Sequence, residues 1–179
     1  MEEDADLLAL CRAGDEQAFE VLLTRHSRFI FNLSYRLLGN AADAEELAQE
    51  AAVRFYQSLG RFRGEVTVRS WLYRLVTNLA VDRLRRRTPV EVELDGVALP
   101  GGTDPQEEAE RRETAAMVRR ALNALPREER VVLVLRDLED RSYQEIAAIL
   151  DLNLGTVKSR IHRARRGLRE RLDGEGGTL

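Results

Sequence analysis

Apolar residues recur at intervals of three and four along most of this chain, and that spacing predicts an all-α protein. In the N-terminal part, a short first helix ends at Gly14, and a cap at Asp15 starts the second helix. Gly39 ends the second helix, because glycine readily adopts the left-handed conformation that closes a helix. The apolar stripe of this helix comprises Phe29, Leu33 and Leu37.

A third and a fourth helix follow, each with an apolar and a polar face. The third opens at Asp43. Its apolar face comprises Leu47, Ala48, Ala51, Phe55 and Leu59, and its other face carries Glu45, Glu46, Gln49 and Arg54. After a break at "GRFRGEV", the fourth covers "TVRSWLYRLVTNLAVDRLRRR", with a core stripe of Val68, Leu72, Leu75, Val76 and Leu79. Successive helical residues turn by about 100°, so a polar stripe runs beside the core stripe. It comprises Arg74, Asn78, Asp82 and Arg85, with Trp71 on the border.

The helical pattern stops in the middle of the chain. Residues 88–105 contain three prolines and three glycines, and residues 88–114 hold eight acidic residues against two basic ones. Prolines and glycines interrupt regular structure, so this stretch predicts a flexible, acidic linker over 88–105. Two domains follow from it, one over residues 1–87 and one over residues 106–179.

The C-terminal part predicts a helix-turn-helix. Residues 106–124 and 127–138 form helices, although "VVLVL" within the second of them would pass for a buried strand out of context. Ser142 and Glu145 have the spacing of a capping box and open the helix "SYQEIAAIL". The inward-facing residues of that helix are Ile146, Ala147, Ile149 and Leu150. "DLNLG" then turns the chain, and a last helix starts near Gly155 or Thr156.

The last helix concentrates positive charge. Residues 155–172 hold seven Lys and Arg against one Glu, in a chain whose net charge is −3. Its packing stripe comprises Val157, Ile161, Ala164, Leu168 and Leu172. The opposite face carries Thr156, Ser159, His162, Arg163 and Arg166, with Lys158 and Arg160 on the flanks. Such a face suits the major groove of DNA, where arginine donates twice to guanine. A solvated C-terminal helix is the alternative interpretation.

Composition excludes several kinds of chemistry. The single cysteine, Cys11, forms no disulfide within the chain and is expected to be a buried or half-exposed thiol. His162 has only His26 as a second histidine, so we expect it to contact solvent or phosphate and no metal. No glycine-rich phosphate loop and no set of nucleophile, histidine and carboxylate is recognisable, which predicts that the protein is not an enzyme and needs no cofactor. The chain has no apolar run near 18 residues and no basic, apolar leader, so a cytoplasmic protein without a membrane segment is expected.

Three stretches together carry a family resemblance. "SYQEIAAIL" followed by "GTVKSRIHRARRGLRERL" resembles the C-terminal DNA-binding domain of bacterial sigma factors, specifically the small, two-domain extracytoplasmic-function type of the sigma-70 family. "ADAEELAQEAAVRFYQSLGRFRG" resembles the helix of that family that binds core polymerase, and "SWLYRLVTNLAVDRLRRR" resembles its minus-10-reading and melting helix. The resemblance covers nearly the whole chain and implies a factor that directs promoter-specific transcription initiation, commonly in a stress response.

The resemblance also implies residue roles. Candidates for docking on RNA polymerase are Asp43, Glu45, Glu46, Gln49 and Glu50. The loop from Phe62 to Ser70, which includes Arg63, would capture a base flipped out of the minus-10 element together with Arg74, Asn78 and Asp82. Arg83, Arg85 and Arg86 would hold the DNA backbone. The helix from Thr156, with Lys158, Ser159, Arg160, His162, Arg163 and Arg166, would read the minus-35 element. The implied partners are core RNA polymerase, promoter DNA and an anti-sigma factor, with the protein itself a monomer.

Other interpretations stay open at this stage. The arginines from Arg83 to Arg87 also suit a solvated helix end that complements the helix dipole, and Trp71 suits the core as well as a stacking platform for bases. The acidic helix face suits plain solvent exposure. A polymerase-independent helix-turn-helix repressor or activator is the alternative function, and it leaves "SWLYRLVTNLAVDRLRRR" unexplained.

Two positions depart from the family pattern. Val68 stands where many members carry an aromatic residue, so the melting surface is expected to be less aromatic. In the turn, Asp151 replaces a frequent glycine. Aspartate tolerates the left-handed conformation better than most residues, so the turn is expected to survive.

Overall fold

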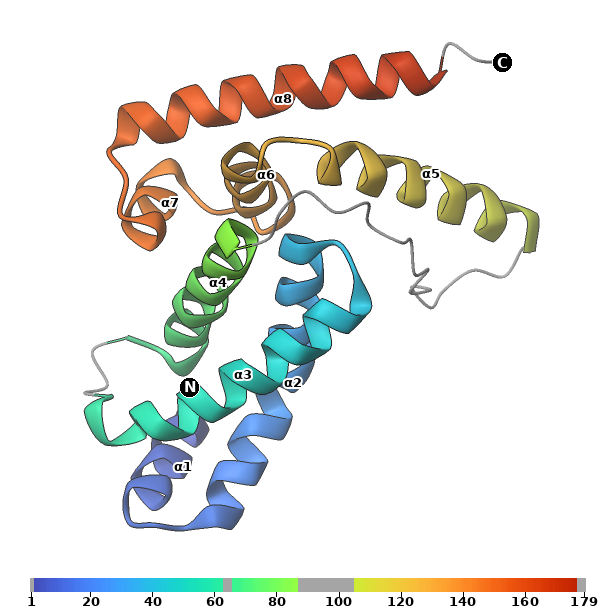
Figure 1. The fold of residues 1–179 in the computed structure, drawn as a ribbon. Helices are drawn as coiled ribbons and strands as arrows, with labels where there is room; N and C mark the ends of the chain where they lie inside the picture. The colour runs from blue at the N-terminus through green and yellow to red at the C-terminus, as the bar shows by residue number, and fades with distance from the viewer. Residues whose placement is uncertain (1, 63–65, 87–104, 177–179) are drawn as a thin grey trace. The chain divides into compact units, whose positions relative to one another are not determined.

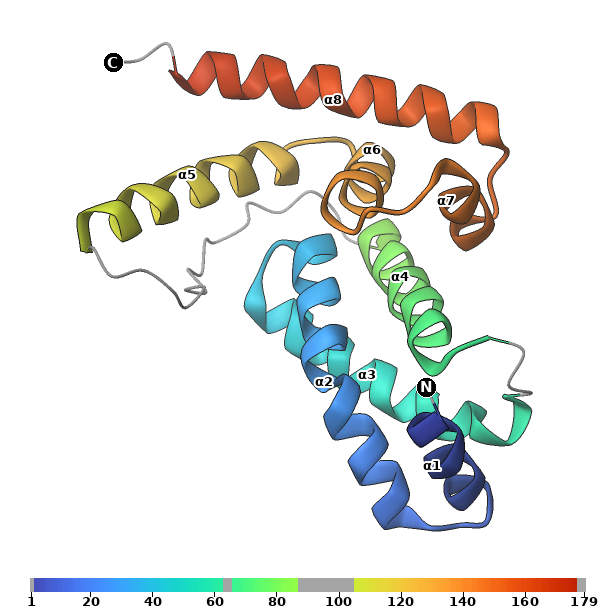
Figure 2. The same cartoon turned by 180° about the vertical axis from the view of Figure 1, so that it is seen from behind.

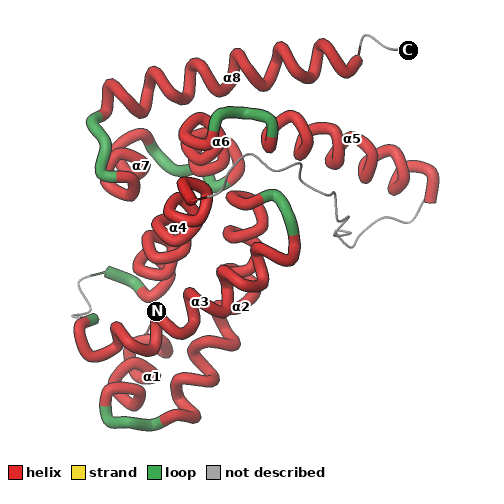
Figure 3. Tube along the Cα trace, in the orientation of Figure 1, coloured by secondary structure: helices red, strands yellow, loops and turns green. Residues whose placement is uncertain are grey.

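The computed structural model describes residues 2–62, 66–86 and 105–176, and the regular structure in these ranges is helical throughout (Figures 1 and 3). The chain divides into two compact units, Met1–Arg86 and Arg87–Leu179. The residues of the expected linker, 88–104, lie outside the described residues, and Pro105 begins a helix.

The N-terminal unit is a bundle of four helices: α1 (Glu2–Arg12), α2 (Glu16–Leu38), α3 (Ala41–Ser58) and α4 (Val68–Arg86), with a 3₁₀ turn, η1 (Leu59–Arg61), after α3. The central helix is α2, which packs against the other three (Figures 1 and 2). The core of this unit comprises buried side chains of all three packed helices: Leu22, Ile30 and Leu33 of α2, Leu47 and Phe55 of α3, and Leu72 and Val76 of α4.

The expected helix boundaries in this unit are explained by local capping. The Asp15 side chain accepts a hydrogen bond from the Ala18 backbone N–H, and Gly39 ends α2 with φ of 86°. The Asn40 side chain accepts from the Asp43 N–H, so α3 begins at Ala41, two residues before the expected start. Asn40 is a good N-cap because its side chain satisfies an amide that the helix leaves without a partner.

Helix α4 is buried on a broader face than its core stripe predicted. Leu75 is only half-buried, whereas Tyr73, Thr77, Ala80 and Leu84 are buried together with the stripe. The reason is that α4 packs against both α2 and α3, which cover two neighbouring sides of it. Phe29, expected in the core, is half-buried, and its ring stacks on that of Tyr73 at 6.1 Å.

The C-terminal unit comprises α5 (Pro105–Asn123), α6 (Arg127–Leu133), α7 (Tyr143–Leu150) and α8 (Leu154–Gly176). A π-helical turn, η2 (Val134–Leu138), continues α6, so the expected helix 127–138 forms with a wider final turn. The apolar run "VVLVL" is helical, and all five of its side chains are buried. Within this unit, α8 packs on α5, α6 and α7 (Figures 1 and 2).

The helix-turn-helix forms with local signals that explain it. The Ser142 and Glu145 capping box is present in full at the start of α7. Only Ile146 of the expected inward set is fully buried, and Ala147, Ile149 and Leu150 are partly so. Asp151 ends α7 in the left-handed conformation with φ of 52°. Asn153 caps α8 by accepting a hydrogen bond from the Thr156 N–H at 2.7 Å, which starts α8 one residue earlier than expected.

Candidate nucleic-acid interface

Helix α8 presents its basic face to solvent. Val157, Ile161 and Ala164 are buried against the rest of the unit, and Leu168 packs on the core cluster of Leu125, Leu133 and Ala164. The residues on the opposite side are exposed: Lys158, Ser159, His162, Arg163 and Arg166. Thr156 and Arg160 are half-buried at its edges. The helical wheel drawn from the sequence therefore describes the orientation of α8 correctly.

Three arginines of α8 are held by carboxylates of the preceding segment, which sequence reasoning missed. Arg160 pairs with Glu128 at 2.5 Å, and the Nε of Arg163 donates to Glu129 at 3.1 Å. Arg165 donates from both Nε and Nη2 to Asp137, at 3.2 and 2.6 Å, and this hydrogen bonding raises the pKa of Arg165. The only signal in the sequence was the acidic "PREER" and "RDLED" on either side of the buried run.

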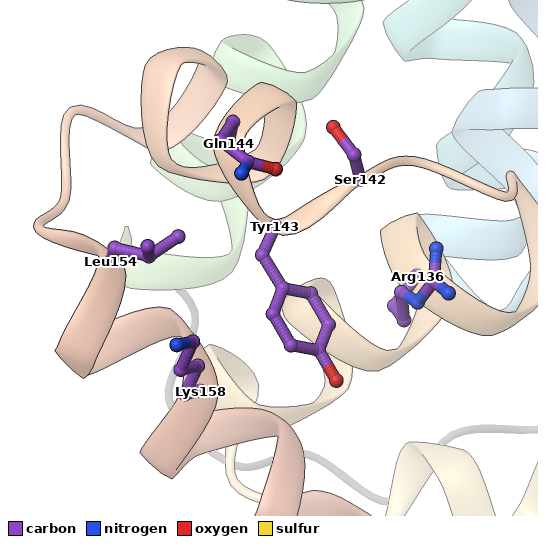
Figure 4. Close-up of a pocket in the computed structure, with 6 residues that line it drawn as sticks. All are labelled: Arg136, Ser142, Tyr143, Gln144, Leu154 and Lys158. Atoms are coloured by element: carbon purple, nitrogen blue, oxygen red, sulfur yellow. The ribbon is translucent and has the colours of Figure 1, made fainter.

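A hollow of about 420 Å³ opens beside the N-terminus of α7. It is lined by Arg136, Ser142, Tyr143, Gln144, Leu154 and Lys158 (Figure 4). The Arg136 guanidinium lies 5.4 Å from the centre of the Tyr143 ring and donates to the Arg141 carbonyl. Two cations, Arg136 and Lys158, thus flank the start of α7, where the helix dipole also favours negative charge. The Ser142 backbone N–H donates to Glu145 and lowers the pKa of that carboxyl.

Helix α4 carries a second exposed polar stripe. The exposed side chains of this stripe are Arg74, Asn78, Asp82, Arg85 and Arg86. Arg85 also lies 4.0 Å from Asp82. Arg63, expected to act with this stripe, lies outside the described residues. Trp71 is half-buried, 5.3 Å from the Phe55 ring and edge-on to Phe62 at 6.1 Å, so it contributes to packing.

Arg83 differs from the other arginines of α4. It is half-buried, lies 3.6 Å from Asp43 and also pairs with Glu46. The Asp43 side chain is 8% exposed and accepts a further hydrogen bond from the Asn40 amide. Both ends of this ion pair were expected to face a partner, one polymerase and the other DNA. In the structure they join α3 to α4.

The other candidate docking residues of α3 face solvent. Glu45, Glu46, Gln49 and Glu50 are exposed, and Glu50 pairs with Arg54 one turn on. Val53 and Tyr56, more than half exposed, continue the same helix face toward its C-terminus. Sequence reasoning did not select these two. An apolar pair next to a polar row is typical of protein interfaces, where aromatic residues are enriched.

The other titratable groups lie away from these surfaces. Cys11 is half-buried, as expected, and burial raises the pKa of its thiol, with a smaller contribution from the Asp15 carboxylate. Among the described residues no group of three or more His, Cys, Asp and Glu is arranged to hold a metal ion. The described helices also include none that is long and apolar enough to cross a membrane.

Comparison with known proteins gives a consistent result for both units. Residues 22–89 match the family model for sigma-70 region 2, and residues 115–168 match that for sigma-70 region 4. The chain is 34% identical over 172 residues to the ECF RNA polymerase sigma factor SigW of Bacillus subtilis, covering 90% of this chain and 92% of the relative. It is 34% identical over 178 residues to the RNA polymerase sigma-H factor of Pseudomonas aeruginosa, covering 93% and 92%.

Two solved structures resemble this chain in fold over most of its length. CnrH, crystallised in complex with the cytosolic domain of CnrY, matches with a TM-score of 0.66 and 28% identity over 96% of this chain and 98% of that one. The sigma factor RpoE of Bartonella quintana, in complex with the anti-sigma factor NepR, matches in fold with a TM-score of 0.67 at 24% identity, over 87% and 96% of the two chains.

Proposed function

Because this chain belongs to the extracytoplasmic-function sigma factors of the sigma-70 family, which direct promoter-specific transcription initiation and are not enzymes, we propose that its two domains divide promoter recognition between them. The C-terminal domain reads the minus-35 element with α8. The N-terminal domain docks on core RNA polymerase with α3 and engages the minus-10 element with α4. The observation that carries this proposal is the exposed, basic face of α8 on a helix-turn-helix.

The α8 role is supported by the chemistry of its exposed side chains. Lys158, Ser159, His162 and Arg166 project from the side opposite the buried residues, at spacings that follow one groove. Arg163 is the candidate for base contact, and Lys158 beside the hollow at α7 is the candidate for a phosphate. Thr156 and Arg160 flank this surface, and the same domain would touch the flap of the polymerase.

The α4 role follows from the cost of opening DNA. Each base-pair step loses about 1.4 kcal/mol of stacking, whereas contacts to single-stranded bases return about 1 to 3 kcal/mol per base. Arg74, Asn78 and Asp82 form the exposed polar row that would hold a flipped base, with Arg85 and Arg86 on the backbone. Arg63 belongs to the same proposal from its place in the sequence.

The α3 role rests on its exposed acidic row. Glu45, Glu46, Gln49 and Glu50 form the docking surface, and Val53 and Tyr56 add apolar area to it. Asp43 is buried beneath that surface, where its contacts with Arg83 and Asn40 fix the start of α3 against α4.

We extend the proposal to regulation and location. A protein inhibitor holds the free factor inactive, and the structure of CnrH in complex with the cytosolic domain of CnrY supports such a partner. The factor acts as a monomer in the cytoplasm, where its polymerase is, and takes part in a stress response. It needs no cofactor.

Run-off transcription with purified core polymerase and a promoter library tests the proposal. The full chain should redirect initiation to a subset of promoters, and Glu45→Lys combined with Glu50→Lys should abolish this and co-elution with polymerase. Glu20→Lys, an exposed charge reversal on α2, is the matched control. A chain that binds palindromic DNA without polymerase would instead support the alternative of an independent repressor or activator.

Asn78→Ala separates docking from melting. It should leave co-elution with polymerase intact but reduce permanganate reactivity of thymines in the minus-10 region. Normal reactivity would assign base capture to another residue.

A further inference from the structure

Three arginines of α8 contact carboxylates of α6 and η2, and each does so in a different way. Arg165 uses Nε and Nη2 together on Asp137, which occupies one whole edge of its guanidinium. Arg160 uses Nη2 on Glu128, and its side chain is 20% exposed. Arg163 uses only Nε, on Glu129, and its side chain is 51% exposed.

The Nε contact leaves the terminal fork of Arg163 available. The two Nη groups carry the N–H pair that matches the O6 and N7 acceptors of guanine. Within the described part of the chain, neither Nη of Arg163 has a hydrogen-bond partner. Arg163 is thus held through its Nε atom, and its two Nη groups remain available on the exposed face of α8.

Glu129 is well placed to fix that orientation. Its side chain is 16% exposed, far less than the 66% of its neighbour Glu128. It belongs to α6, next to the buried Arg130 and Val131, and α6 packs directly on α8. A largely buried carboxylate restricts the rotamers of a flexible arginine before DNA arrives, which reduces the entropy lost on binding.

We propose that Glu129 is a positioning residue that aims the Arg163 fork at one guanine of the minus-35 element and so sets the specificity of this factor at that base pair. The inference rests on the proposed function of α8. It names a residue outside the recognition helix, 34 positions away in the sequence, as a determinant of which promoters are read. Glu129 would also repel a phosphate, which disfavours binding in which Arg163 contacts only the DNA backbone.

The test measures discrimination by the holoenzyme, reconstituted from the full chain and core polymerase. Binding is measured on a selected promoter and on a set of duplexes with each base pair of the upstream element replaced in turn. Wild type should prefer one guanine by about tenfold or more, and Arg163→Ala should remove that preference. Glu129→Gln and Glu129→Ala should reduce the preference severalfold at the same base pair and leave the other positions unchanged.

A control variant and a double variant test whether Glu129 acts through Arg163. Glu128→Gln removes the carboxylate that pairs with Arg160 and leaves the contact of Glu129 with Arg163 in place, so it should leave discrimination at that guanine unchanged. In the Arg163→Ala background, Glu129→Gln should cause no further loss, because its effect acts through Arg163. Arg163→Lys should not restore the preference, since lysine has no fork.

The outcomes distinguish the role of Glu129 from the proposed function of α8. Equal loss on every sequence, loss at a different base pair, or additive effects of the two substitutions would overturn the role of Glu129 while leaving the proposed function intact. If the wild-type holoenzyme showed no preference anywhere in the upstream element, the proposed function of α8 would fail first. Circular dichroism confirms folding, and if Glu129→Ala unfolds the domain, the near-isosteric Glu129→Gln decides the matter.

Discussion

Replacing Arg83 by Met should destabilise the N-terminal domain, although the family resemblance assigns this arginine to DNA. Arg83 on α4 lies 3.6 Å from Asp43 on α3, whose side chain is 8% exposed, and it also pairs with Glu46. Without Arg83, the carboxylate of Asp43 keeps its hydrogen bond from Asn40 but loses the positive charge of the Arg83 guanidinium. Removing the cation that lies beside a buried carboxylate is costly.

The size of the expected destabilisation follows from the distance between Arg83 and Asp43 and from their burial. Two unit charges 3.6 Å apart attract by about 5 kcal/mol at an effective dielectric constant near 20. Desolvation of both groups offsets part of this attraction, and the Arg83 side chain keeps 25% of its exposure. The exposed Glu46 adds at most about 1 kcal/mol. We therefore expect a loss of about 2 kcal/mol in the free energy of unfolding, and a coupling of similar size between Arg83→Met and Asp43→Asn in a double-mutant cycle.

The assay uses an internal reporter. Trp71 is the chain's single tryptophan and packs against Phe55 and Phe62 in the N-terminal domain, so its fluorescence during urea unfolding reports on that domain. Arg86→Met, an exposed arginine of the same helix, is the control and should change the free energy by less than about 0.5 kcal/mol. If Arg83→Met matched this control, or if the cycle showed no coupling, the reasoning would be wrong. A transcription defect of an Arg83 variant would not by itself identify a DNA contact.

Three further predictions concern stability. Asp151→Gly should stabilise the C-terminal domain by about 1 kcal/mol in thermal unfolding, because Asp151 has φ of 52°, which glycine adopts without strain; destabilisation would show that its side chain has another role. Ser142→Ala should destabilise the same domain by about 1 kcal/mol through loss of the capping box, and an unchanged midpoint would contradict this. Burial raises the pKa of Asp4, but hydrogen bonds from Arg25 and His26 outweigh it, so the pKa lies below its usual value. The stability that Asp4 contributes is therefore complete above about pH 4 and lost below it; in urea unfolding, the deficit of Asp4→Asn should shrink on acidification, and a constant deficit would refute the assignment.

The features that could be predicted from the sequence are local ones. The caps at Asp15 and Ser142 depend on atoms three residues away, and the buried stripe of α8 depends only on helical periodicity. Asp151 in the left-handed conformation is a local property of the turn as well.

The features that could not be predicted depend on neighbours that are distant in sequence. The sequence shows that Asp43 is acidic and lies on a polar stretch, but the packing of α4 against α3 turns it inward onto Arg83. The pairing of Arg163 with Glu129 likewise depends on where α6 crosses α8. A helical wheel places a residue on a face, but it contains no information about which other helix covers that face.

The ion pairs of α8 should weaken the binding of this helix to DNA. Arg160, Arg163 and Arg165 are already paired with carboxylates of the same domain, so each gains less from an added phosphate than an unpaired cation would. Each phosphate contact steepens the salt dependence of binding by nearly one counterion, so these three paired arginines add little to that dependence. Duplex promoter binding without polymerase should therefore be weak, and the slope of log K against log salt should be shallow. Nanomolar binding that resists salt would contradict this, because such affinity would require cations that the carboxylates do not restrain.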